Sequence, residues 1–313
     1  MNKLPKTVLI IRPGALGDTL MLMPSIAALG ASTEIIFAGR SPGLFYLKPY
    51  VHRTMDYEGP GWHTLFQEEA ASRPDFVLPT SDLVIAFLSD PGGTVKKNLR
   101  YLLSGTPAYV FAPFPSKGTG EHIALYLARC IKKAGLPITP EKCLETAAQQ
   151  ALLEKECDLS RNGTVVFHPG SGSEAKNHAP AFWLTLIREW RWHLDMSRNL
   201  TLLFGPAEEG LYAFFKDHPA TIGINKKVTP EHSELVSLLS RARLYVGHDS
   251  GITHLAAMLG TPAIALFKNS PANQWRPLGP FVSTIEKEDT DKGLALKVLR
   301  EAEKLEAIAY GRH

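Results

Sequence analysis

Cysteine is scarce in this chain of 313 residues. The three cysteines, Cys130, Cys143 and Cys157, are odd in number and form no CxxC pair. This pattern argues against a disulfide framework and against a zinc knuckle. We therefore expect reduced thiols in a cytoplasmic protein.

Long apolar runs are missing as well. Before Arg12, the longest run of consecutive apolar residues has four members, residues 8–11. The later run 19–31 is interrupted by Pro24. A secretory signal requires a longer apolar core, and a membrane span requires about 20 apolar residues. Any contact with a membrane is therefore expected to be peripheral.

Neither sign of charge dominates. The formal net charge is +3 and neither half of the chain is polybasic, which argues against bulk binding of nucleic acid. Hydrophobic residues make up 44% and charged residues 21% of the chain, as in ordinary globular proteins. Because a domain commonly contains about 100–200 residues, the length favours two domains.

Several ligand-binding signatures are also absent. The stretch RPGALGD (12–18) lacks the dinucleotide fingerprint GxGxxG, and Arg40 follows the next strand where an acid would bind ribose. The stretch HPGSGSEAKNHAP (168–180) lacks the Walker pattern, and GHDSG (247–251) lacks the GxSxG elbow. His248 and His254 do not have the i, i+4 spacing of zinc ligands. NAD enzymes, serine hydrolases and zinc enzymes are therefore disfavoured.

Runs rich in β-branched residues alternate with amphipathic runs along the chain. Strands are expected at 7–11, 34–38, 82–88, 107–112, 163–170, 199–205, 242–247 and 261–267, and helices at 19–29, 123–135, 181–194 and 251–259. This alternation predicts an α/β protein with two doubly wound parallel sheets. A polar stretch places the linker near 150–162, and the last segment predicts a helix that docks back across the molecule.

Ligands of open α/β sheets bind at the carboxyl ends of the strands, so the loops there hold the candidate residues. In RPGALGD, Gly14 and Gly17 permit close approach of the backbone. Asp18 fits either an N-cap or a general base. The loop 168–180 offers glycines, serines and Lys176 to an anion, or is an ordinary polar loop with an exposed lysine.

The third loop precedes a short helix that begins at Gly251. The free N–H groups of this helix, with the hydroxyls of Ser250 and Thr253, could hold a phosphate. His254 fits either a packed structural histidine or a ligand contact.

Three segments resemble glycosyltransferase family 9, the family of the ADP-heptose:lipopolysaccharide heptosyltransferases. They are RPGALGDTLMLMPSIAAL, HPGSGSEAKNHAPAFWLTLI and VGHDSGITHLAAMLGTPAIALF, which follow in the family's order over nearly the whole chain. The resemblance implies a GT-B fold, with two Rossmann-like domains facing a central cleft. Residues 1–155 would bind the acceptor and residues 163–290 the nucleotide sugar, and the helix 291–310 would pack back on the first domain.

The resemblance also implies roles for single residues. Asp18 would be the general base, and Glu209 would meet the nucleotide ribose. The remaining donor-binding residues would be Ser171, Lys176, Asp249, Ser250, Gly251 and His254. Inverting transfer requires a base for the acceptor hydroxyl and stabilisation of the leaving diphosphate. The helix at Gly251 and Lys176 could stabilise this charge without a metal or another cofactor.

The acceptor side is less defined. Gly17, Lys96, Lys97 and Arg100 are the candidates, and the three cations fit either an anion site or a solvated helix face. We expect an inverting transferase that moves a sugar, such as the heptose of ADP-heptose, to a lipid-linked or lipopolysaccharide-core acceptor at the cytoplasmic face of the inner membrane. The alternatives are a sugar-nucleotide epimerase of the same fold and a non-catalytic nucleotide-sugar-binding protein.

Overall fold

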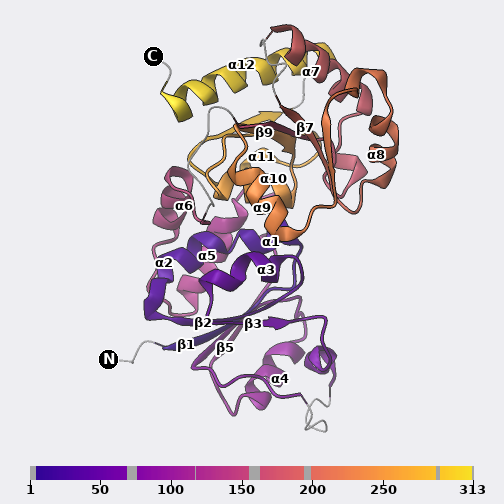
Figure 1. The fold of residues 1–313 in the computed structure, drawn as a ribbon. Coiled ribbons are helices and arrows are strands. Elements are labelled where there is room, and N and C mark those ends of the chain that lie inside the picture. Colours follow the sequence, from indigo (N-terminus) through magenta and orange to yellow (C-terminus); the bar gives the residue numbers. More distant parts are fainter. Residues whose placement is uncertain are drawn as a thin grey trace. The chain divides into compact units, whose positions relative to one another are not determined.

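The computed structural model describes residues 5–68, 76–116, 118–154, 163–193, 199–286 and 290–311. The chain divides into two compact units, Met1–Thr146 and Ala147–His313 (Figure 1). Most of the predicted linker, residues 155–162, lies outside the described residues. Just before it, the N–H groups of Leu152 and Leu153 donate to the carbonyl of Met258, so this stretch is attached to the second unit.

A five-stranded parallel sheet forms the centre of the first unit, in the order β3-β2-β1-β4-β5. Its strands are β1 (Thr7–Ile11), β2 (Glu34–Gly39), β3 (Arg53–Asp56), β4 (Leu83–Phe87) and β5 (Ala108–Phe111). The order runs outward from β1 in both directions. The loops after β1 and β4 therefore diverge, which opens a crevice at the carboxyl ends of these strands.

Helices cover both faces of this sheet (Figure 1). They are α1 (Leu16–Leu20), α2 (Met23–Leu29), α3 (Gly43–Leu47), α4 (Thr94–Leu102), α5 (Ile123–Lys133) and α6 (Pro140–Gln149), with the short 3-10 helices η1 (Gly30–Ser32), η2 (Lys48–Tyr50) and η3 (Trp62–Phe66). On one face, Leu9 and Ile11 of β1 share a core with Leu99 of α4 and Leu65 of η3. Helices α1, α2, α3 and α5 lie on the opposite face (Figure 1).

The predicted helix 19–29 is two helices, α1 and α2, so the prediction of one element is wrong. Pro24 lies in the first turn of α2, where its missing N–H costs no hydrogen bond. Because proline cannot continue an existing α-helix, the chain restarts at this point. The restart leaves α1 as a short helix at the end of the first loop.

The second unit has a six-stranded parallel sheet in the order β11-β10-β9-β6-β7-β8. Its strands are β6 (Val165–His168), β7 (Leu200–Phe204), β8 (Asn225–Val228), β9 (Leu244–His248), β10 (Ala263–Phe267) and β11 (Val282–Glu286). The order reverses beside β6, as it does beside β1 in the first unit. The predicted pair of doubly wound parallel sheets is confirmed.

The helices of the second unit are α7 (Pro180–His193), α8 (Glu209–Lys216), α9 (His232–Ser240), α10 (Gly251–Met258), α11 (Ala272–Trp275) and α12 (Asp291–Tyr310), with η5 (Glu174–Lys176) and η6 (Pro219–Thr221). Side chains of α7 and α12 belong to one core with the sheet, Trp183 and Val298 among them. Helices α7 and α12 therefore cover the same face of this sheet.

The final helix, α12, packs on the second unit. Its Leu294, Val298 and Leu305 lie in the core of that unit. Glu306 forms an ion pair with Arg243, with 2.7 Å between Oε1 and Nε, and the Tyr310 hydroxyl donates to the Arg243 carbonyl at 2.8 Å. The apolar stripe of this helix is therefore used within the second unit, and packing of helix 291–310 on the first domain stays a prediction.

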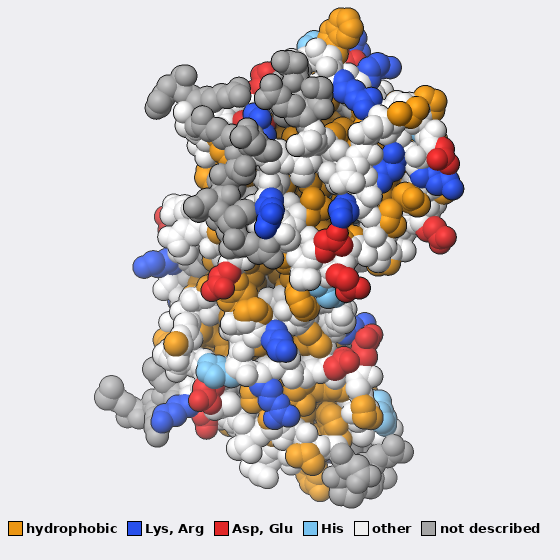
Figure 2. All heavy atoms as spheres, viewed as in Figure 1, with side chains coloured by type: hydrophobic (Ala, Val, Ile, Leu, Met, Phe, Trp, Pro, Cys, Tyr) orange, Lys and Arg blue, Asp and Glu red, His pale blue; other side chains and the backbone are white. Residues whose placement is uncertain are grey.

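The surface carries charges of both signs. On the face drawn in Figure 2, Lys and Arg side chains lie among Asp and Glu side chains on each unit, without a large patch of one sign. In the part of the chain that the structure describes, no helix combines the length and the apolar character needed to cross a bilayer.

Candidate functional site

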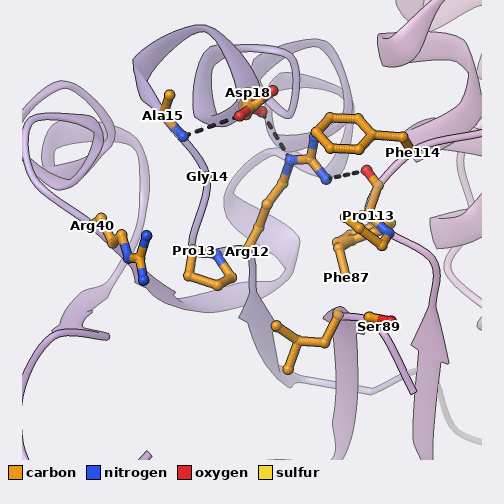
Figure 3. Close-up of a pocket in the computed structure, with 11 residues that line it drawn as sticks. Arg12, Pro13, Gly14, Ala15, Asp18, Arg40, Phe87, Ser89, Pro113 and Phe114 are labelled. Atoms are coloured by element: carbon orange, nitrogen blue, oxygen red, sulfur yellow. Dashed lines mark hydrogen bonds between the residues drawn. The ribbon is translucent and has the colours of Figure 1, made fainter. Parts of the chain in front are cut away.

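A cavity of about 390 Å³ lies at the carboxyl end of the first sheet. It sits where the strand order reverses beside β1, which is the usual ligand site of an open α/β sheet. Figure 3 shows the side chains that surround it. The lining residues are Arg12, Pro13, Gly14, Ala15, Asp18, Arg40, Phe87, Leu88, Ser89, Pro113 and Phe114.

Asp18 lies in the first turn of α1 and belongs to this lining. Its Oδ2 accepts a hydrogen bond of 3.0 Å from the N–H of Ala15, which occupies the N-cap position. The N-cap interpretation of Asp18 is therefore wrong in position. A Cβ at Gly14 would lie only 2.5 Å from Cβ of Asp18, so glycine is required for this close approach. Among the described residues, none donates a hydrogen bond to Oδ1.

Arg12 is buried under the cavity, with 2% of its surface exposed. Its Nε donates to the Asp18 carbonyl at 2.9 Å and its Nη1 to the Pro113 carbonyl at 2.8 Å. The guanidinium lies 5.5 Å from the ring centres of both Phe87 and Phe114. Burial lowers the pKa of Arg12 from 12.5 to about 10, an effect that Asp18 partly opposes. Arg12 thus holds the start of α1, at Asp18, and the loop after β5 together.

The remaining acceptor candidates do not line this cavity. Gly17 lies within α1, next to Asp18. Lys96, Lys97 and Arg100 are exposed on α4, whose buried side is formed by other residues of the helix. Their positions match the solvated face, and a role for them in acceptor binding stays a prediction.

In the second unit, Lys176, Asp249 and His254 form a polar cluster. Lys176 Nζ donates to Asp249 Oδ2 at 2.7 Å, and His254 Nε2 lies 3.7 Å from Asp249 Oδ1. Asp249 and His254 are almost fully buried, whereas 37% of the Lys176 side chain is exposed. Burial alone would raise the pKa of Asp249, but hydrogen bonds from His254 and Lys176 lower it to about 2. A charged Asp249 therefore fixes a partly exposed lysine at this sheet edge.

Ser250 and Gly251 begin α10 directly after Asp249. The Ser250 hydroxyl caps this helix, accepting from the Thr253 N–H at 3.3 Å and bonding to the Thr253 hydroxyl at 3.0 Å. Gly251 is the first helical residue. Because the Ser250 side chain is used inside the protein, the backbone N–H groups of the first turn are the better donors for a phosphate.

The loops after β6 and β7 enclose a second cavity of about 390 Å³. Ser171 lies in the first of these loops, with Oγ 2.6 Å from Asn177 Oδ1. Glu209 is exposed at the first residue of α8. The lining residues are Gly172, Ser173, Glu174, Asn177, His178, Ala179, Pro180, Ala207, Glu208, Gly210 and Leu211. Ser171 and Glu209 are therefore sequence neighbours of lining residues but do not line the cavity themselves.

The contacts of His248 are structural. His248 is fully buried, and its Nε2 accepts from the His178 N–H at 2.8 Å. Burial, with His178 and His168 nearby, lowers its pKa to about 3, so the ring is neutral. Within the described ranges, no group of three or more His, Cys, Asp or Glu side chains is arranged to hold a metal ion.

A family comparison places the chain among known proteins. The model of glycosyltransferase family 9 (heptosyltransferase) matches residues 131–304, more than half of the chain. The chain belongs to glycosyltransferase family 9. It is therefore a glycosyltransferase, as the sequence motifs indicated.

Similar proteins agree with the family 9 assignment. A relative from Haemophilus influenzae, which carries a provisional glycosyltransferase name, is 22% identical over an alignment of 328 residues. This alignment covers 92% of this chain and 88% of the relative. E. coli heptosyltransferase WaaC with ADP is 14% identical, covers 94% of this chain and 99% of its own, and has a TM-score of 0.64. E. coli ADP-heptose lps heptosyltransferase II is 18% identical, covers 96% and 98%, and has a TM-score of 0.64. These two likenesses establish the GT-B-like fold.

Three residues at the sheet edges of this family 9 enzyme were not among the predicted site residues. Arg12 and Arg40 line the first cavity, and Lys268 Nζ donates to the Asn177 carbonyl at 2.8 Å beside the second. Each is the first residue after a strand. A charged side chain directly after a buried apolar strand was the sequence signal that could have identified them.

Proposed function

We propose that this family 9 enzyme moves a heptose from ADP-heptose to a hydroxyl of a lipopolysaccharide-core or related glycan, with inversion at the anomeric carbon. Asp18 is the general base, and Lys176 with the N-terminus of α10 stabilises the leaving diphosphate. The observation that carries the proposal is the Asp18 carboxylate, which lies in a cavity at a sheet switch point with Oδ1 available to an acceptor hydroxyl.

The proposed base has suitable surroundings. Its Oδ2 is held by the Ala15 N–H, so the carboxylate is oriented before an acceptor binds. A general base must lie within about 3 Å of the proton that it removes. An acceptor hydroxyl in the 390 Å³ cavity can approach Oδ1 within that distance. Removal of its proton makes the oxygen nucleophilic, and this oxygen then forms the new glycosidic bond.

The proposed donor site has the charge that the leaving group requires. The bond from the anomeric carbon to the diphosphate oxygen breaks, and the electron pair stays on the diphosphate. Lys176, fixed by Asp249, and the N–H groups at Gly251 offer positive charge to that oxygen. Glu209, Ser171 and His254 are proposed to complete the donor site. Gly17, Lys96, Lys97 and Arg100 are proposed acceptor contacts.

The nucleotide and the sugar are suggested by similar proteins. The E. coli structures of this fold include a heptosyltransferase with ADP and one with ADP-2-deoxy-2-fluoro heptose. We therefore propose adenine as the base of the donor and heptose as the transferred sugar. Peripheral contact with the inner membrane would bring the enzyme to a lipid-linked acceptor.

A thermal-shift panel of nucleotides and nucleotide sugars tests the donor first, because a ligand that binds the folded state raises the melting temperature. ADP-heptose should then be consumed only when a core glycan is present, with release of ADP. Conversion of the donor alone into an epimer would instead show an epimerase, and tight binding without turnover would show a binding protein.

Asp18→Asn tests the base. We expect kcat to fall by about 10²–10⁴-fold, the usual contribution of a general base, while the dissociation constant of ADP stays unchanged. Asp217→Asn is the matched control, because Asp217 is 84% exposed and its ion pair is with the exposed Lys216 of the same surface. Turnover by the Asp18→Asn enzyme at the control rate would refute the assignment.

A further inference from the structure

A buried chain of polar side chains crosses the second unit from Glu208 to Ser250. Glu208 Oε2 lies 3.1 Å from His168 Nε2, and His168 Nδ1 lies 2.9 Å from the Tyr245 hydroxyl. The Tyr245 hydroxyl is 3.1 Å from Thr253 Oγ1, which is 3.0 Å from Ser250 Oγ. All five side chains are buried. We call them the Glu208–Ser250 chain.

The two ends of the Glu208–Ser250 chain lie at the two loops of the proposed donor site. At one end, Glu208 Oε2 accepts from the Gly205 N–H at 2.6 Å and so shapes the loop that leads to Glu209. At the other end, Ser250 caps α10 at the position where Gly251 would meet the diphosphate. The chain therefore connects the loop proposed for the ribose with the helix proposed for the diphosphate.

Two glycines make room for this chain. A Cβ at Gly170 would lie 1.8 Å from Glu208 Oε1, and a Cβ at Gly247 would lie 2.4 Å from the Tyr245 hydroxyl oxygen. Neither glycine has a positive φ, so the need for glycine comes from space and not from backbone conformation. The loop after β6 and strand β9 thus each lack a side chain where the polar atoms of the Glu208–Ser250 chain pass.

Stability alone does not account for such a chain. Burying polar groups has a desolvation cost that hydrogen bonds only roughly offset, and apolar residues of similar volume are often as stabilising. A fully bonded polar network does, however, fix the relative positions of its members more closely than apolar packing. We therefore expect the Glu208–Ser250 chain to fix the positions of the two loops more than to stabilise the fold.

The protonation states of Tyr245 and Glu208 favour a positioning role over proton transfer. Burial raises the pKa of Tyr245 above its usual range. Burial opposes ionisation of Glu208, but the hydrogen bond from His168 and the backbone N–H groups lower its pKa overall. Tyr245 therefore stays a neutral hydroxyl and Glu208 a carboxylate near neutral pH.

We propose that the Glu208–Ser250 chain holds the loop at Glu209 and the start of α10 as one unit, with His168 and Tyr245 as positioning residues for the nucleotide part of the donor. This inference rests on the proposed function, because it takes the second unit to bind a nucleoside diphosphate. The chain touches the donor only through the two loops that it connects.

Tyr245→Phe tests the chain at its centre, since it removes the one atom that joins the His168 side to the Thr253 side. ADP binding to the purified full-length protein is measured by calorimetry. We expect the dissociation constant to rise about five- to tenfold, the effect of one or two lost hydrogen bonds. Tyr310→Phe is the matched control, because it removes a hydroxyl that donates to the Arg243 carbonyl in the same unit, and ADP affinity should not change.

Coupling distinguishes positioning from simple destabilisation. Glu208→Gln and Ser250→Ala alter the two ends, which the chain connects. In the wild type their effects on ADP affinity should be non-additive, and in the Tyr245→Phe background they should become additive. If Tyr245→Phe folds poorly, Thr253→Val breaks the same connection from the other side.

The outcomes separate the two proposals. If the wild-type protein binds no nucleoside diphosphate of a panel of ADP, UDP and GDP, both the proposed function and this inference are overturned. If it binds ADP but Tyr245→Phe behaves as Tyr310→Phe does, or if the two ends remain additive throughout, only the positioning chain is overturned. A raised dissociation constant with coupling that disappears supports it.

Discussion

Replacement of Arg12 by methionine should separate stability from activity. Burial lowers the pKa of Arg12 from 12.5 to about 10, and each pKa unit corresponds to about 1.4 kcal/mol, so holding this charge costs about 3 kcal/mol. Its hydrogen bonds to the carbonyls of Asp18 and Pro113 contribute about 1.5–3 kcal/mol each. Together the two hydrogen bonds contribute about 3–6 kcal/mol, so the net effect of Arg12 on stability lies between about zero and 3 kcal/mol.

We therefore expect Arg12→Met to change the free energy of unfolding by less than about 3 kcal/mol, since apolar side chains often replace buried charges without loss. The rate should respond much more strongly. Without the hydrogen bond to the Asp18 carbonyl, the start of α1 can shift, and a displacement of about 1 Å in a catalytic group can lower the rate about 100-fold.

Two measurements check this reasoning. Urea unfolding gives the stability, and kcat for sugar transfer gives the rate. Arg129→Met is the control, because Arg129 is exposed and pairs with Glu121 and Glu141 on the surface of the same unit; it should change neither quantity appreciably. An Arg12→Met enzyme with the kcat of the control would refute the positioning role of Arg12, and so would a loss of activity explained wholly by unfolding.

Two further predictions concern the cluster at Asp249. Lys176→Ala should raise the dissociation constant of ADP, measured by calorimetry, about tenfold, because it removes a positive charge beside the diphosphate. The control Lys216→Ala, on α8, should leave this dissociation constant unchanged. Equal ADP affinities of the two variants would exclude Lys176 from the donor site. The pKa of Asp249 is lowered from 3.8 to about 2, so its stabilisation, roughly 2.5 kcal/mol, is present above pH 4 and is lost as the pH falls to 2. The difference in unfolding free energy between wild type and Asp249→Asn should shrink over that interval, and a constant difference would contradict the assigned pKa.

The sequence predicted the central strands well because they are buried on both faces. Strands such as β1 and β10 have continuous apolar runs, which are typical of parallel sheets. The edge strands β3 (RTMD) and β8 (NKKV) are half-exposed and polar, so no run of apolar residues marked them. Pattern reasoning therefore located the centre of each sheet and the edge strand β5, but missed the edge strands β3 and β8.

The sequence identified the loops that form the site better than it identified the side chains within those loops. Asp18, Lys176 and Asp249 lie at the carboxyl ends of the sheets, as the position of their loops indicated. The adjacent acids Glu208 and Glu209 could not be assigned from sequence, because only the path of the chain shows that Glu208 turns inward to His168. The partner of α12 was equally hidden, since an amphipathic stripe does not name the surface that it covers.

The side chain of Glu208 takes up space that belongs to two sequence positions, 208 and 170. The carboxylate of Glu208 fills the place where a side chain at position 170 would begin. The two positions therefore constrain each other, because an alanine at position 170 would require the Glu208 carboxylate to move or a shorter side chain at position 208. We therefore expect positions 170 and 208 to covary among members of the family.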